Sequence, residues 1–143
     1  IYLPASEKQW IEEKTVPDEV LKGIENILLV DDQDAVLNVG EALLKKLGHT
    51  VFTAKSGEEA ITFYGKNKDQ IDLVILDMVM PVMGGGETYT DLKKINPEVK
   101  VILSSGYSLN GQAVKILKNG CNGFIQKPFT IGELSRKIRD VLD

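Results

Sequence analysis

The sequence predicts an α/β protein, in which a parallel sheet carries helices on both of its faces. From residue 26 to the C-terminus, short apolar runs alternate with amphipathic stretches, and this alternation occurs five times. Such a rhythm is typical of consecutive βαβ units. The apolar runs are also nearly continuous, as expected of strands that are covered on both faces.

The bounds of the expected elements follow from apolar spacing and from residues that begin or end helices. Gly48 is a typical helix end, and Ser56 with Glu59 and Thr130 with Glu133 match the capping box that begins a helix. The expected strands are 27–30, 50–54, 71–76, 99–104 and 123–126. The expected helices are 35–47, 56 to about 64, 87–95, 109–118 and a last helix from Thr130 onward. The apolar stripe of the first helix consists of Val36, Val39, Leu43, Leu44 and Leu47.

Size and composition suit one globular domain and exclude several classes of protein. The chain has 143 residues, of which 43% are hydrophobic and 27% are charged, ordinary values for a soluble domain. No apolar run approaches about 18 residues and no signal peptide is visible, so we expect a cytoplasmic location. The net charge of −4 argues against a nucleic-acid partner. A single cysteine, Cys121, excludes an internal disulfide and a cysteine-based metal site.

Charged residues follow three of the expected strands. Asp31 and Asp32 come after the first strand, Asp77 after the third and Lys127 after the fifth. Ligands of open parallel sheets bind outside the carboxyl ends of the strands, so these residues predict a cation site beside an anion site. Each residue alone has a simpler explanation, because an acid can cap a helix and Lys127-Pro128 can form a turn.

Four motifs in this order closely resemble the receiver domain of bacterial two-component response regulators. They are Asp31-Asp32, Asp77-Met78-Val79-Met80-Pro81, Ser104-Ser105-Gly106 and Lys127-Pro128-Phe129, and the resemblance extends from residue 26 to residue 143. It implies a flavodoxin-like, doubly wound (βα)5 fold with a five-stranded parallel sheet of order 2-1-3-4-5. It also implies phosphoryl acceptance in two-component or phosphorelay signal transduction.

The resemblance implies a metal-assisted phosphoacceptor site. Asp77 is expected to accept the phosphoryl group. Asp32, Asp77 and the backbone carbonyl of Val79 are expected to bind Mg²⁺ or Mn²⁺, and Asp31 is expected to act through a metal-bound water. Mg²⁺ prefers oxygen ligands, and together with Lys127 it would neutralise charge that develops during the transfer.

The same resemblance assigns roles to residues that contact the phosphoryl group or respond to it. Lys127 and the hydroxyl of Ser105 are expected to bind phosphoryl oxygens, although alternation along the strand does not separate Ser105 from Ser104. Ser105 and Phe124 are expected to form the conformational switch, whereas Phe124 can also be an ordinary core residue. The Lys127-Pro128 peptide bond is expected to be cis.

Residues 1–25 break the alternation of strands and helices. The sequence Ile1-Tyr2-Leu3-Pro4-Ala5 is similar to the closing strand of a histidine-kinase ATPase domain, and a polar stretch follows it. The resemblance thus implies the C-terminal receiver of a hybrid sensor histidine kinase, with an ATPase end and linker at 1–25 and the receiver at 26–143. The partner would be a kinase dimerisation and phosphotransfer domain, in cis or in trans, or a histidine phosphotransfer protein. No membrane contact is expected for this fragment, which would assist its own phosphorylation and dephosphorylation without being a turnover enzyme.

Other functions remain to be weighed against this one. A degenerate receiver that acts only as a docking module would keep the fold without the chemistry. A phosphatase of the haloacid dehalogenase type would carry a second Asp at the position of Val79. Residues 84–86 are three glycines without the Lys-Ser/Thr of a P-loop, and no dinucleotide-binding glycine motif follows the first strand. His49, the only histidine, is expected to be a solvated turn residue, so a donor histidine would lie elsewhere.

Overall fold

The computed structural model describes residues 21–80, 83–106, 111–118 and 120–143. The expected ATPase strand, most of the expected linker, and the start of the fourth expected helix at Leu109 and Asn110 lie outside the described residues. The elements are β1 (Asn26–Val30), α1 (Asp34–Lys46), β2 (Thr50–Ala54), α2 (Gly57–Asn67), β3 (Leu73–Asp77), α3 (Gly85–Ile95), β4 (Val101–Ser105), α4 (Gly111–Lys118), β5 (Gly123–Gln126) and α5 (Ile131–Leu142).

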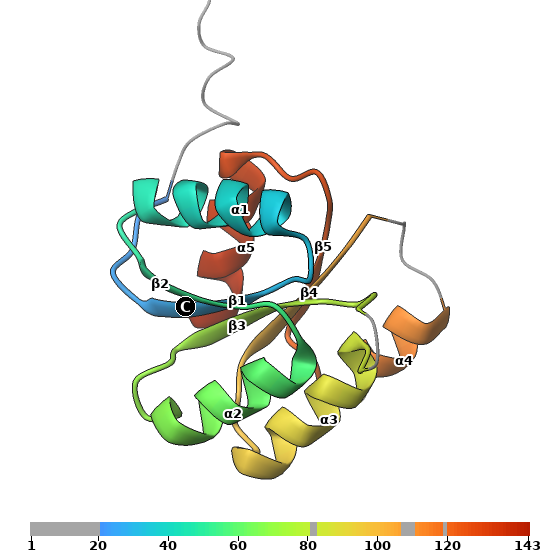
Figure 1. Cartoon of the computed structure of the whole chain (residues 1–143). Helices are drawn as coiled ribbons and strands as arrows, with labels where there is room; N and C mark the ends of the chain where they lie inside the picture. The colour runs from blue at the N-terminus through green and yellow to red at the C-terminus, as the bar shows by residue number, and fades with distance from the viewer. Residues whose placement is uncertain (1–20, 81–82, 107–110, 119) are drawn as a thin grey trace, which may run out of the picture.

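The five strands form one parallel sheet in the order β2-β1-β3-β4-β5. Helices α1 and α5 cover one face of the sheet, and α2 and α3 cover the other (Figure 1). The predicted α/β class, the doubly wound arrangement and the strand order are therefore confirmed.

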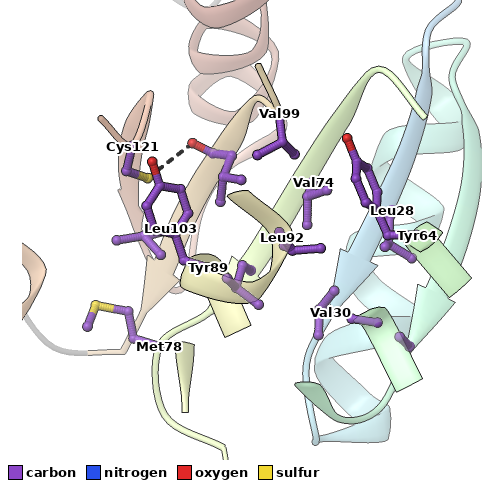
Figure 2. Close-up of a cluster of buried hydrophobic side chains, with 14 of the residues drawn as sticks. Leu28, Val30, Tyr64, Val74, Met78, Tyr89, Leu92, Val99, Leu103 and Cys121 are labelled. Carbon is purple, nitrogen blue, oxygen red and sulfur yellow. Dashed lines mark hydrogen bonds between the residues drawn. The ribbon is translucent and has the colours of Figure 1, made fainter. Parts of the chain in front are cut away.

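The strands are buried on both faces because consecutive side chains point to opposite sides of the sheet. Leu28, Val30, Val74 and Leu76 face α2 and α3, where they pack with residues such as Leu92. Figure 2 shows this cluster, in which the rings of Tyr64 and Tyr89 lie among the aliphatic side chains and Cys121 donates a hydrogen bond to the Val101 carbonyl. The intervening residues face α1 and α5: Ile27, Leu29, Leu73 and Ile75, with Leu44, Leu134 and Ile138.

Most element bounds agree with the prediction, and the differences have local causes. Helix α2 continues past Gly65 to Asn67, whose side-chain amide donates to the carbonyl of Phe63 at 2.9 Å and so supports the last turn. The capping box expected before α2 is only half formed: Ser56 accepts from the Glu59 N–H, but the Glu59 carboxylate accepts from the N–H of Lys55. The capping box of Thr130 and Glu133 before α5 is complete.

The expectation that His49 is a solvated turn residue is wrong. His49 is only 4% exposed, and its Nδ1 lies 3.3 Å from the carbonyl oxygen of Glu25. The segment that precedes β1 covers the turn, since the Gly23 N–H donates to the carbonyl of Leu47 and the Glu25 carboxylate pairs with Arg139 of α5 at 2.6 Å. Sequence spacing alone does not show this long-range packing.

Among the helices that the structure describes, none has the length and apolar character needed to cross a membrane.

Candidate functional site

The sheet brings the three predicted strand ends together. Strands β1 and β3 are paired in register from Ile27 with Leu73 to Val30 with Leu76, so the next residues, Asp31 and Asp77, emerge side by side. On the other side of β3, strand β4 leads to β5, and the N–H of Lys127 donates to the carbonyl of Ser105 at 2.7 Å. The predicted meeting of acids and a lysine at this edge is present in the structure.

Lys127 pairs with two buried carboxylates. Its Nζ lies 2.9 Å from Oδ2 of Asp31 and 3.1 Å from Oδ1 of Asp77. The side chains of Asp31 and Asp77 are only 2% and 4% exposed, against 17% for Lys127, so these interactions are poorly screened by solvent. One ammonium group thus bridges both carboxylates.

These surroundings favour the charged form of Lys127 but disfavour that of Asp77, because the pKa values of both groups are raised. Burial raises the pKa of Asp77, and the charge of Asp31 raises it further; Lys127 and the N–H of Val79, which donates to the Asp77 carboxylate, compensate only in part. Burial by itself would lower the pKa of Lys127, but its hydrogen bond with Asp31 and the charges of Asp77 and Asp31 raise its pKa overall. The site therefore contains more negative charge than Lys127 offsets.

This excess negative charge suits a divalent cation. One carboxylate oxygen each from Asp31, Asp32 and Asp77 lie within 4.8 Å of one another. Three carboxylates and one ammonium leave an imbalance of two negative charges, and carboxylate oxygens are ligands that Mg²⁺ and Mn²⁺ favour. The residues present thus fit the metal that the resemblance implies.

A pocket of about 790 Å³ opens beside the charged cluster. Asp32, Asp77 and Lys127 form its polar part, and side chains from α1 and from the loop after β5 extend it with an apolar wall. Val79 and Val39 are 62% and 60% exposed. The lining consists of Asp32, Gln33, Ala35, Val36, Val39, Gly40, Asp77, Val79, Gly106, Lys127, Pro128 and Phe129.

Sequence reasoning missed the apolar wall of this pocket. The helical spacing of Val39 predicts a place on the buried stripe of α1, yet the structure exposes this side chain beside the site. The nearby Gly40 is the buried position instead, because a Cβ atom there would lie 2.7 Å from a methyl carbon of Leu29. Gly40 is the residue in the sequence that could have indicated the buried face of α1, because a glycine within a helix can mark a close approach to a neighbouring strand, here β1.

The two candidate hydroxyls are equally buried, with Ser104 and Ser105 each 3% exposed. The register places Ser104 opposite Asp77, whereas Ser105 lies opposite Gln126 at the end of β4. Phe124 is partly buried and packs against the cluster on the α2 and α3 face. The Lys127-Pro128 peptide bond is cis.

Comparisons with known proteins agree with this arrangement. The sequence profile of the response regulator receiver domain matches residues 27–139. The chain is 35% identical over 123 residues to sensor kinase CckA of Brucella abortus, covering 86% of this chain and 13% of the kinase. It is 32% identical to the probable transcriptional regulator ycf27 of Porphyridium aerugineum, covering 82% of this chain and 48% of the regulator. The chain therefore spans at most about half the length of these relatives.

Solved structures show the same likeness in three dimensions. A receiver domain protein from Clostridium thermocellum superposes with a TM-score of 0.79 at 33% identity, covering 83% of this chain and 94% of that one. A chain of the CheX-CheY-BeF3-Mg complex from Borrelia burgdorferi gives 0.79 at 30% identity, covering 85% and 92%. On the match of sequence, fold and site, the chain belongs to the response regulator receiver domain family of two-component signalling.

Proposed function

We propose that this domain accepts a phosphoryl group on Asp77 from a phosphohistidine and changes conformation in response. The observation that carries the proposal is the placement of Asp77 at a buried strand end, where two other carboxylates and the ammonium of Lys127 surround it. A buried nucleophile beside its counter-ions is the arrangement that transfer between two anionic groups requires.

In the proposed reaction, an oxygen of the ionised Asp77 carboxylate attacks the phosphorus atom. The O–P bond forms as the P–N bond to the donor imidazole breaks, and the electron pair stays on the imidazole nitrogen, which then takes a proton. Lys127 already lies 3.1 Å from Asp77, so its ammonium can move from the carboxylate to a phosphoryl oxygen without leaving the site. The backbone N–H of Val79 helps to keep the attacking carboxylate ionised, because it lowers the pKa of Asp77.

Mg²⁺ or Mn²⁺ would neutralise negative charge on the phosphoryl group and on the acids. Asp32, Asp77 and the backbone carbonyl of Val79 are the proposed ligands, with Asp31 acting through a water. The oxygen-rich cluster of acids supports this assignment, and so does the Borrelia burgdorferi relative, whose structure is described as a complex with BeF3 and Mg.

Ser105 and Phe124 are the proposed switch. An aspartyl phosphate adds about two negative charges and new acceptor oxygens, which would draw the hydroxyl of Ser105 toward it. Phe124 packs against the core only in part, so its ring can take a second position. The phosphoryl group would thus favour one of two packings through its differential contacts.

The wider assignment is a receiver of a hybrid sensor histidine kinase in the cytoplasm of a bacterium. The likeness to a sensor kinase supports it, as does the similarity of residues 1–5 to the end of a kinase ATPase domain. On this proposal residues 1–25 are that end and a linker, and residues 26–143 are the receiver. Its partner is a kinase dimerisation and phosphotransfer domain or a histidine phosphotransfer protein.

The deciding experiment is intact mass spectrometry after incubation with acetyl phosphate, with and without Mg²⁺. We expect a gain of one phosphoryl group that requires Mg²⁺, disappears in Asp77→Asn and persists in Asp69→Asn, which changes an exposed acid away from the site. If neither acetyl phosphate nor phosphoramidate labels the wild-type chain, the proposal fails and a docking module that works without phosphorylation takes its place.

A further inference from the structure

Gly85 lies where helix α3 meets the peptide that follows the phosphoacceptor. It is buried at the first position of α3, and its N–H donates to the carbonyl of Met78 at 2.9 Å. A Cβ atom at Gly85 would lie 2.7 Å from the carbonyl oxygen of Asp77 and 2.7 Å from Cα of Met78. Both atoms are backbone, so no side-chain rotation could make room for it.

The peptide that Gly85 touches has little freedom to move. On its other side, β3 is paired with β4, and the Met78 N–H donates to the carbonyl of Ser104 at 2.9 Å. Behind Gly85, helix α3 is anchored by the buried side chains of Tyr89 and Leu92. An added methyl group would therefore strain the contact between the two backbones, and the chain from Asp77 to Val79 would have to shift to relieve that strain.

That part of the chain carries two groups of the site. The backbone N–H of Val79 favours the charged form of the Asp77 carboxylate, and the Val79 carbonyl is a proposed metal ligand. We propose that Gly85 is a positioning residue: its missing side chain lets α3 hold the Asp77–Val79 backbone where the carboxylate and the carbonyl can bind one cation. This inference rests on the proposed function, and it assigns a role to a residue outside the predicted site.

The chain offers a matched control at the preceding position. Gly84 caps the same helix with an extended backbone (φ −76°, ψ 176°) that any residue adopts. A Cβ atom there would meet only the Met78 carbonyl oxygen, at 3.5 Å, which is an ordinary contact. Serine is also a favoured residue at a helix N-cap, so Gly84→Ser adds a side chain beside Gly85 without forcing the backbone.

The test is the Mg²⁺ dissociation constant of wild type, Gly85→Ala and Gly84→Ser, measured by isothermal titration calorimetry with circular dichroism as the check on folding. We expect weaker binding by about 10- to 100-fold in Gly85→Ala, the range for lost support of metal ligands, and a change within about twofold in Gly84→Ser. Phosphorylation by acetyl phosphate at subsaturating Mg²⁺ should slow in the same order.

Equal Mg²⁺ affinity in Gly85→Ala and wild type would overturn the inference. If Gly85→Ala does not fold, the titration is repeated in sucrose, which favours the compact state; a chain that is unfolded there as well shows a role in folding and also overturns it. A wild-type chain that binds no Mg²⁺ and takes up no phosphoryl group would instead refute the proposed function.

Discussion

At the scale of single residues, two neighbouring serines, Ser104 and Ser105, compete for the role of the hydroxyl that binds the phosphoryl group. The register sets Ser104 opposite Asp77, whereas resemblance to the receiver family favours Ser105, the last residue of β4. The carbonyl of Ser105 accepts from the N–H of Lys127, so Ser105 adjoins the lysine that is proposed to bind the phosphoryl group. There is therefore a structural reason to assign the phosphoryl-binding role to either hydroxyl, and a matched pair of variants can show which of them has it.

We expect Ser105→Ala to slow phosphorylation of Asp77 by about tenfold or more, because loss of one hydrogen-bond donor to a developing charge has effects of this order or larger. Ser104→Ala should stay within about twofold of wild type. Initial rates of mass gain with acetyl phosphate at saturating Mg²⁺ provide the measurement. A larger effect of Ser104→Ala would reverse the assignment and make the register the better guide.

The charged residues of the site could be predicted from sequence because each stands at the end of an apolar run. Strand pairing then brings Asp31, Asp77 and Lys127 together with little further choice. His49 could not be predicted in this way, since its burial depends on Glu25 and on the segment before β1. Gly85 could not be predicted either, because its role depends on a contact between backbones.

At the scale of elements, helix α1 contributes the apolar wall of the site. Its hydrophobic spacing predicts a helix but does not show which apolar residue leaves the core. Val39 is exposed and lines the pocket, whereas Leu37 and Leu44 are buried against the sheet. An exposed valine beside the proposed phosphoacceptor is suited to contact the proposed histidine-bearing partner, whereas a small phosphodonor would not need this contact.

We expect Val39→Glu to reduce phosphotransfer from a phosphorylated histidine domain by about tenfold or more, because a charge brought into an apolar contact must lose its water. Labelling by acetyl phosphate should be unchanged. Asn38→Glu is the control, since it places the same charge at a neighbouring exposed position outside the pocket lining. Equal losses with both donors would indicate damage to the site and would contradict a role in docking.

At the scale of the whole molecule, different groups of residues lie at the carboxyl edge of the sheet, where the strands end, and at its amino edge, where the strands begin. The carboxyl edge carries Asp77, the proposed phosphoacceptor. At the amino edge, the N–H of Leu21 donates to Oγ of Ser135 at 3.2 Å, and Glu25 lies between Arg139 of α5 and His49. The segment that leads into β1 is thus attached to α5, so part of the expected linker is integrated with the domain.

The same cluster makes a prediction about pH. Burial lowers the pKa of His49 below 6.5, Glu25 opposes this effect and Arg139 adds to it. The fold therefore favours neutral His49, and the free energy of unfolding should fall as the pH is lowered from 6.5 through the pKa of the folded state. Glu25 acts in a lower range: burial by itself would raise its pKa, but Arg139 keeps that pKa below 4.5, so the ion pair is retained while His49 titrates.

Because His49 is the only histidine, its NMR titration can be followed without ambiguity. We expect Arg139→Gln to raise the pKa of His49, since a repelling positive charge is removed, and Glu25→Gln to lower it, since the attracting negative charge is removed. Asp143→Asn is the control, because Asp143 contacts Arg139 only at 3.7 Å and is 66% exposed. Shifts of the same sign in the two test variants would mean that His49 responds to general loosening of the amino edge. Opposite shifts, with phosphorylation of Asp77 unchanged, would establish that the segment before β1 is held to α5 by this charge cluster and that the attachment is independent of the chemistry at the other edge.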